Sequence, residues 1–339
     1  LYLWVWTAFC CIQVIVILNN SGYTDANPEK ALETILSYLF LVHFLDLFFK
    51  RSGRKEVVFL WKYLFAMLML ELISVPLYHL GAISIYWLGI KTRATEAIVA
   101  FLLINLILKG HIKKSWFCSG IILSIVIVLI LKISTAVIGM ALIAGCWWLL
   151  KKPHLKWFLK LLQSSAIISV TLVLTVGVLF FDIQTRFSDI FSFAFSKDIT
   201  FSGRVELWEN GITKLALYDG IHHLWGYGFS NIPLWTGWKY FDITTEAHNQ
   251  LLQMLHDTGL IGTIILYVTW FLQMHEMKKC SNQDVRNIIA STCFACFIMC
   301  ITEIFCYHSY FYIVLAIAAR SGDIVKNLNL HQFKWRKET

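Results

Sequence analysis

Charged residues and prolines are scarce in this chain of 339 residues. Charged side chains make up 15% of the sequence, against roughly 25% in a typical soluble domain, while hydrophobic residues reach 58%. A soluble fold cannot bury that much apolar surface, so the composition excludes an ordinary soluble domain. The 4 prolines and 18 glycines exclude a low-complexity chain. The composition therefore predicts an integral membrane protein, and its 15% aromatic content supplies many residues of the type that anchors at membrane interfaces.

Cysteine and histidine show no metal-binding pattern. The nine cysteines lie mostly inside apolar runs, and the long polar segment 182–246 contains none of them. His222 and His223 are adjacent, and adjacent histidines rarely bind one metal ion together. The sequence therefore predicts no disulfide framework, no metal site and no cofactor.

Apolar stretches recur along the chain, and a transmembrane helix needs ~20 such residues to cross ~30 Å of hydrocarbon. The candidate spans are 1–18, 33–49, 57–79, 95–108, 116–131, 133–150, 157–181, 247–274, 285–302 and 304–320. We expect the first to be a span rather than a cleavable signal peptide. The predicted fold is an all-α polytopic membrane protein with about ten transmembrane helices and one large extracytoplasmic loop containing short helices.

The net charge of +8 comes from short clusters of Lys and Arg between the apolar stretches. Cytoplasmic loops have this pattern under the positive-inside rule, whereas a nucleic-acid surface gathers its cations in one stripe. We therefore exclude nucleic acid as a partner. Both chain ends are then cytoplasmic and residues 182–246 lie outside, although Lys91 and Arg93 would also lie outside. The clusters placed inside are 50–55, 109–115, 151–156, 275–284 and 326–339.

This topology predicts four segments. They are an N-terminal transmembrane bundle (1–181), an extracytoplasmic loop (182–246), C-terminal transmembrane helices (247–325) and a cytoplasmic basic tail (326–339). Within the loop, apolar residues at helical spacing predict a short helix after Arg204, capped by Ser202. Gly226-Tyr227-Gly228 predicts a turn. Lys132 is predicted to form a tight outer turn between two spans, and Thr302-Glu303 is predicted to form another outer turn.

Three motifs follow one another in and after the loop. Residues 202–208 read Ser-Gly-Arg-Val-Glu-Leu-Trp, residues 224–228 read Leu-Trp-Gly-Tyr-Gly, and residues 247–249 read Ala-His-Asn, with Gly259 and Gly262 downstream. In order, spacing and topological side they resemble the shared domain of the bacterial O-antigen ligase and polysaccharide polymerase family. The resemblance extends more loosely to Ser134-Thr135-Ala136 and to Glu303.

The resemblance implies a multi-pass protein of the bacterial cytoplasmic (inner) membrane with an extracytoplasmic active site. The implied activity is glycosyl transfer from an undecaprenyl-pyrophosphate-linked saccharide to a sugar hydroxyl, without a metal or nucleotide sugar. Polymerisation of repeat units into capsule or O-antigen is the leading hypothesis, and ligation of a finished glycan to lipid A core of lipopolysaccharide is the runner-up. Membrane lipids, a chain-length regulator and a flippase are the implied partners.

A lipid-linked saccharide flippase or transporter is the alternative from another class. Such a protein is expected to carry charges or broken helices at midmembrane depth and repeated halves. Apart from Glu71 and Asp46, the predicted spans carry few buried charges. The single large outer loop also breaks any symmetry between halves, so we favour the transferase.

Charged and titratable residues on the outer side are the candidates for this chemistry. A pyrophosphate leaving group gains negative charge as the glycosidic bond breaks, and Arg binds phosphate oxygens through two hydrogen bonds at once. Arg204 is the first candidate, and Arg186 and Lys132 are further ones. His248 is the natural general base for the acceptor hydroxyl, because its pKa lies near working pH. Glu303 is the other titratable group able to assist.

Neighbouring residues are candidates for substrate binding. Asn249 is predicted to orient the imidazole or to bind sugar, and the turn residues Tyr227 and Gly228 are predicted to line the site. The aromatic residues that could stack on sugar rings are Trp208, Trp225, Trp235, Trp238, Tyr227 and Tyr240. Structural alternatives stay open: a snorkelling Arg204, a helix-capping His248, and aromatic residues of an interfacial belt. Gly259 and Gly262 are expected to serve close packing.

Overall fold

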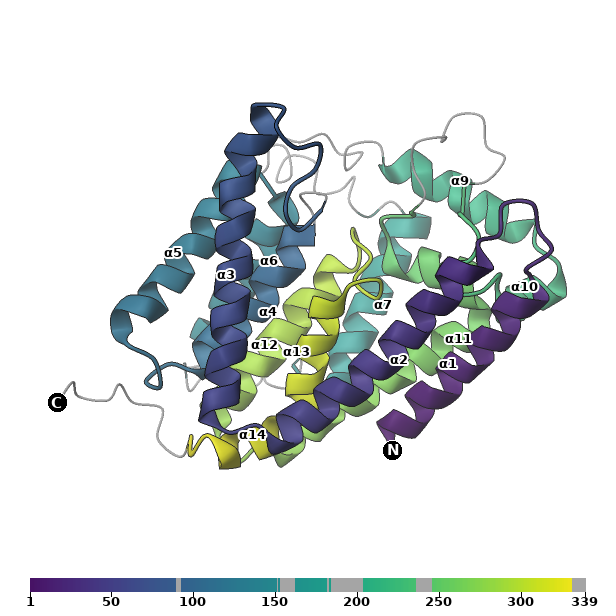
Figure 1. Cartoon of the computed structure of the whole chain (residues 1–339). Coiled ribbons are helices and arrows are strands. Elements are labelled where there is room, and N and C mark those ends of the chain that lie inside the picture. Colours follow the sequence, from purple (N-terminus) through teal and green to yellow (C-terminus); the bar gives the residue numbers. More distant parts are fainter. Residues whose placement is uncertain are drawn as a thin grey trace. The chain divides into compact units, whose positions relative to one another are not determined.

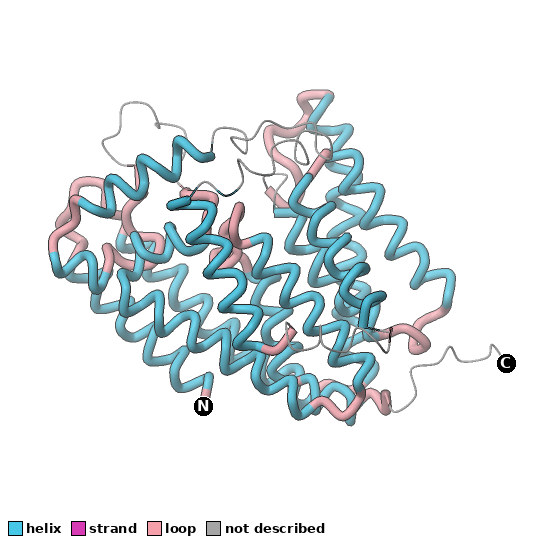
Figure 2. Tube along the Cα trace, turned by 180° about the vertical axis from the view of Figure 1, so that it is seen from behind, coloured by secondary structure: helices cyan, strands magenta, loops and turns pink. Residues whose placement is uncertain are grey.

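The computed structural model describes residues 1–89, 93–150, 152, 162–181, 183, 204–235 and 246–330. Within these ranges the chain is helical, and the one β-feature is an isolated bridge between Tyr86 and Gly89 (Figures 1 and 2). The all-α class predicted from the sequence is therefore confirmed for the described part of the chain.

Helices fill most of the predicted apolar stretches. The longer ones are α1 (Tyr2–Asn19), α2 (Pro28–Arg51), α3 (Arg54–His79), α4 (Arg93–Ile107), α5 (Lys114–Leu131), α6 (Ser134–Leu150), α7 (Ser164–Phe181), α11 (Gln250–His275), α12 (Gln283–Met299) and α13 (Ser309–Ala319). The shorter ones are α9 (Arg204–Ala216), α10 (Gly220–Trp225), the 3-10 helix η3 (Glu276–Lys279) and α14 (Ser321–Asn327).

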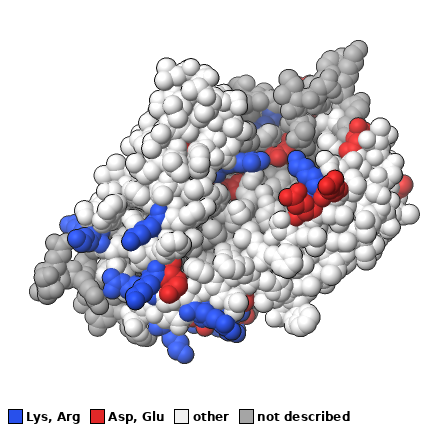
Figure 3. All heavy atoms as spheres, viewed as in Figure 1, with Lys and Arg blue, Asp and Glu red and all other residues white. Residues whose placement is uncertain are grey.

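Six of the described helices are long and apolar enough to cross a membrane: α1, α2, α3, α5, α7 and α11 extended by η3. Helices α6 and α13 are apolar but shorter. These helices identify an integral membrane protein, and the face in Figure 3 accordingly shows few charged side chains. Helix α4 is buried on nearly every side, as expected for a helix that is apolar all round. The prediction of about ten crossings stays a prediction.

The chain divides into two compact units. The first comprises residues 1–43, 165–272 and 300–307, and the second comprises residues 44–164, 273–299 and 308–339. In the second unit α4 packs against α3, α5, α6, α12 and α13. The buried carboxylate of Asp46 is neutralised there by Arg320, whose Nε and Nη2 lie 2.6 Å from its two oxygens. The carboxylate of Glu71 accepts a hydrogen bond from the Leu88 amide at 2.8 Å.

Helix α11 in the first unit is interrupted at Gly259, whose backbone is not helical (φ 61°, ψ −171°). Only glycine fits there without strain, because a Cβ atom would lie 2.4 Å from the backbone of Leu224. Gly226 is packed just as tightly, since a Cβ atom there would lie 2.5 Å from the backbone of Asp257. The expected close packing at Gly259 is therefore confirmed, and it brings the turn 226–228 against the interruption in α11.

Two turns differ in how well the sequence predicted them. The tight turn at Lys132 is confirmed: this residue ends α5 in the left-handed conformation (φ 51°), and α6 begins at Ser134. The chain also leaves its helices at Thr302-Glu303 as expected, but the spans predicted on either side are too long, because α12 ends at Met299 and α13 begins only at Ser309. Residues 300–308 form a longer irregular segment, whose backbone is held by side chains of α11. Ser202, the predicted cap of α9, lies outside the described residues.

Candidate functional site

Arg204 is the first residue of α9, and its guanidinium is paired with Glu303. Nη2 lies 3.0 Å from Oε1 of the carboxylate, and Nη1 donates to the carbonyl oxygen of Thr302. The two side chains are only 21% and 10% exposed, so solvent screens this pair less than an exposed one. Arg204 therefore points at the segment 300–307 instead of reaching freely towards lipid headgroups.

His248 lies two residues before the start of α11 and contacts the other oxygen of the same carboxylate. Its Nδ1 is 3.6 Å from Oε2 of Glu303, and its side chain is 27% exposed. Its backbone is in the left-handed region (φ 47°), which is uncommon for a residue other than glycine. One carboxylate thus bridges a cation and an imidazole, so Arg204, His248 and Glu303 meet although they are far apart in the sequence.

The ionisation of Glu303 follows from these neighbours. Burial by itself would raise the pKa of the Glu303 carboxyl. The contact with His248 and the charge of Arg204 outweigh burial and hold this pKa below its usual value of 4.5. Glu303 is consequently an anion at neutral pH, despite being buried.

The segment that carries Glu303 is fixed by Gln250, the first residue of α11, and by Asn249 just before it. Asn249 donates from Nδ2 to the carbonyl oxygen of Ile301 at 2.8 Å. The side-chain oxygen of Gln250 accepts from the amides of Phe305 (2.8 Å) and Cys306 (3.0 Å). These bonds satisfy backbone groups that no helix satisfies, which explains why the segment keeps an irregular path.

Asn249 caps α11, a role that the sequence left open for His248. Its Oδ1 accepts from the amide of Leu252 at 3.0 Å, and the residue is fully buried. Both polar atoms of the Asn249 side chain are therefore engaged inside the protein. The geometry gives it a structural position beside His248, and its contact with a sugar stays a prediction.

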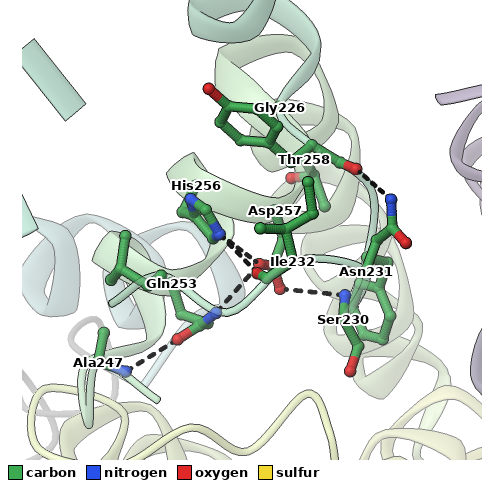
Figure 4. A network of polar contacts seen from close by, with 12 residues as sticks. Gly226, Ser230, Asn231, Ile232, Ala247, Gln253, His256, Asp257 and Thr258 are labelled. Carbon is green, nitrogen blue, oxygen red and sulfur yellow. Dashed lines mark hydrogen bonds and ion pairs between the residues drawn. The ribbon is translucent and has the colours of Figure 1, made fainter. Parts of the chain in front are cut away.

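A buried polar network connects Ala247, the residue before His248, with Gln253 and Asp257 (Figure 4). The amide of Ala247 donates to Oε1 of Gln253 (2.8 Å), and Nε2 of Gln253 donates to Oδ1 of Asp257 (3.0 Å). Oδ2 of Asp257 accepts from the amide of Ser230 (3.4 Å) and from the hydroxyl of Tyr307. Asp257 itself is completely buried. The network ties the residue before His248 both to the turn 226–230 and to the segment 300–307.

Sequence reasoning missed this network, although a signal was present. Gln250, Gln253 and Asp257 recur at intervals of three and four residues inside an otherwise apolar stretch, which places them on one face of α11. A polar face on a predicted span indicates a functional or structural cluster within the protein.

The turn residues Tyr227 and Gly228 pack against the protein itself. The ring of Tyr227 stacks on His222 with centroids 4.1 Å apart, and it meets the edges of Tyr23 and Tyr218. Burial raises the pKa of the Tyr227 hydroxyl, and the charge of neighbouring groups adds to the effect. Gly228 has φ 102°, and a Cβ there would lie 2.6 Å from Ile17. These contacts explain the turn motif by packing, and its role in substrate binding stays a prediction.

Trp208 is enclosed in the core of the first unit. It is 1% exposed, and its indole Nε1 donates to the carbonyl oxygen of Ala247 at 2.9 Å. The predicted sugar-stacking role finds no support at Trp208, because the side chain belongs to a buried apolar cluster. The residue instead fixes the backbone next to His248. Trp235, at 4% exposure, is a core residue of the same cluster.

Other candidates lie elsewhere. Lys132 is exposed at the turn between α5 and α6 in the second unit, so its part in the site stays a prediction. Arg186, Trp238 and Tyr240 lie outside the described residues. Among the residues that the structure describes, no group of three or more His, Cys, Asp or Glu side chains is arranged to hold a metal ion.

The described residues thus define an integral membrane protein with an Arg–Glu–His cluster at the start of α11. Comparison with protein families agrees with that class: the family described as O-antigen ligase matches residues 119–267. The match runs from α5 into α11 and confirms the resemblance seen in the sequence motifs. Arg204 and His248 lie inside the matched residues, whereas Glu303 lies beyond them.

A curated protein also matches part of this chain. The exopolysaccharide production protein ExoQ of Rhizobium meliloti (strain 1021) is 31% identical to this chain over 112 residues. The matched part is 30% of this chain and 25% of that protein, so it spans about a quarter of the relative's length. No solved structure gives a significant match.

Proposed function

We propose that this chain is a membrane glycosyltransferase that polymerises undecaprenyl-pyrophosphate-linked oligosaccharide repeat units into a surface polysaccharide. The observation that carries the proposal is the bridge that Glu303 makes between Arg204 and His248. The family match over residues 119–267 supports the reaction class. The printed role of the relative, exopolysaccharide production, supports a glycan product. The proposed active site faces the outside of the bacterial cytoplasmic membrane, with both chain ends in the cytoplasm.

Arg204 is proposed to bind the pyrophosphate of the lipid-linked donor. A guanidinium has five N–H donors, so Arg204 keeps donors for phosphate oxygens while it remains bonded to Glu303 and Thr302. Its position at the first turn of α9 places it at the positive end of the helix dipole, which favours an anion. A fixed cation of this kind stabilises the charge that develops on the leaving group, without a metal ion.

His248 is proposed to act as the general base. Its imidazole takes the proton of the acceptor hydroxyl, whose oxygen forms the new bond to the anomeric carbon of the donor sugar. The bond from that carbon to the pyrophosphate oxygen breaks, and the pyrophosphate leaves with the electron pair. Glu303 stabilises the imidazolium that forms, because its carboxylate lies 3.6 Å from Nδ1. Attack opposite the leaving group predicts inversion at the anomeric carbon.

The test is a chain-lengthening assay with the protein in membranes and a purified lipid-linked repeat unit. Arg204→Ala and His248→Ala are each expected to slow lengthening severely, to a small but measurable residual rate, whereas the control His223→Ala, an exposed histidine of α10, keeps the full rate. Undiminished lengthening in both site variants contradicts the mechanism. Transfer of a finished glycan to lipid A core without lengthening identifies a ligase. Translocation without lengthening identifies a flippase.

A further inference from the structure

A second candidate site lies in a cavity of about 240 Å³ in the second unit, apart from the residues of the proposed reaction. Its walls come from the residues just before α7, the end of α11, η3 and α12. The charged residues among the described lining are Lys278 of η3 and Arg286 of α12. Two cations and no carboxylate among the described lining residues favour an anionic ligand.

Both cations have hydrogen-bond donors to offer a ligand. Lys278 is exposed, and Arg286 is half-buried. The guanidinium of Arg286 donates from Nη2 to the side-chain oxygen of Gln283, which leaves most of its five N–H donors for a ligand. Arg binds phosphate through paired hydrogen bonds, while Lys adds a mobile point charge.

The rest of the lining combines buried polar and apolar groups. Asn287 and Ser164 are buried polar residues, and Met274 and Met277 are buried apolar ones. A free phosphate ion gains nothing from the methionine side chains, whereas a phospholipid places glycerol and acyl carbons against them. The lining therefore suits a phosphate group attached to an apolar chain.

The position of the cavity along the predicted spans agrees with a headgroup ligand. It lies at the end of the span formed by α11 and η3, in the basic cluster 275–284 that we expect in the cytoplasm. Basic pockets between transmembrane helices on this side bind the headgroups of anionic lipids. We propose that the cavity binds the phosphate group of an anionic phospholipid of the cytoplasmic leaflet, such as phosphatidylglycerol.

The test is native mass spectrometry of the full chain in detergent, titrated with phosphatidylglycerol or with phosphatidylcholine of the same acyl chains. The double variant Lys278→Gln/Arg286→Gln is expected to bind phosphatidylglycerol about tenfold more weakly, because it loses the charge-assisted contacts. The control Lys279→Gln should bind normally, since Lys279 pairs with Glu276 at 2.5 Å and does not line the cavity. The charge-retaining variant Lys278→Arg/Arg286→Lys should also keep binding, which separates loss of charge from misfolding.

Three results would overturn the inference. Equal affinity of the unmodified chain for the two lipids would show that the anionic headgroup is not recognised. Unchanged phosphatidylglycerol binding by the double variant that lacks both charges would place the lipid elsewhere. Displacement of the lipid by inorganic phosphate at a similar concentration would assign the cavity to free phosphate.

Discussion

Replacement of Glu303 by Gln tests how the cluster is held together. The change keeps the shape of the side chain but removes the charge that bridges Arg204 and His248. A hydrogen bond to a charged group contributes roughly 1.5–3 kcal/mol, against roughly 0.5–1.5 kcal/mol between neutral groups. The Arg204 contact alone therefore predicts a loss of about 1–2 kcal/mol in the free energy of unfolding at pH 7.

The pH dependence of that loss has a definite sign. Because the pKa of Glu303 is lowered from 4.5 in the folded protein, its charge stabilises the fold fully above pH 4.5. This contribution disappears as the pH falls through the folded pKa, where the carboxyl takes up a proton. The side-chain amide in the Glu303→Gln variant does not titrate. The stability difference between the unmodified chain and this variant should therefore be full at pH 7 and shrink below pH 4.5.

Thermal unfolding of the detergent-purified chain between pH 7 and pH 3 measures this difference. Glu209→Gln, at an exposed position on α9, serves as the matched control. Its stability difference from the unmodified chain should not shrink between pH 7 and pH 3. In a double-mutant cycle, the loss of unfolding free energy in the Arg204→Gln/Glu303→Gln double variant should be smaller than the sum of the losses in the two single variants. A stability difference that stays constant with pH, together with additive losses, would refute the ion pair as the source of the effect.

Further predictions concern the residues around the cluster, each checked by thermal unfolding of the purified chain. Trp208→Phe removes the hydrogen bond to Ala247 and should lower the free energy of unfolding by about 1 kcal/mol. Trp208→Ala also leaves a cavity in the packed core and should lower it by about 3–5 kcal/mol. Equal losses in the two variants would contradict the packing role. Asn249→Ala removes the cap of α11 and should cost about 1 kcal/mol or more; no loss would contradict the capping role. Gly259→Ala should destabilise by more than about 1 kcal/mol, since its Cβ would collide with backbone at φ 61°. Gly145→Ala, with open space around its Cβ, is the control and should not destabilise.

Much of the helical framework follows from the sequence because hydropathy is a local property. Most apolar stretches contain a helix close to the expected limits, and the turn at Lys132 lies where a single polar residue interrupts two apolar runs. The segment 300–308 was not predicted, because its irregular path depends on distant partners. Side chains of Gln250 and Asn249 hydrogen-bond to its backbone, and no local pattern in residues 300–308 predicts those bonds.

The candidate site was also predicted from the sequence only in part. Motif order led to Arg204 and His248, and the position of Glu303 in an outer turn suggested a helper. The sequence did not indicate that Glu303 contacts both of them, because this depends on tertiary folding. It left Trp208 open as a sugar platform or an interfacial residue, since an aromatic residue next to a catalytic motif looks the same in sequence whether it is exposed or enclosed. The 1% exposure of Trp208 favours the enclosed position, and its contact with a sugar stays a prediction.

The most direct test of the central claim is the rate of chain lengthening in Arg204→Ala, His248→Ala and the double variant, at saturating lipid-linked donor. Residues that act as one unit show non-additive losses, because removal of either one already disables the shared step. We predict that the double variant is no slower than the slower single variant. Losses that multiply in the double variant would mean that Arg204 and His248 act independently, and would contradict a single cluster built on Glu303.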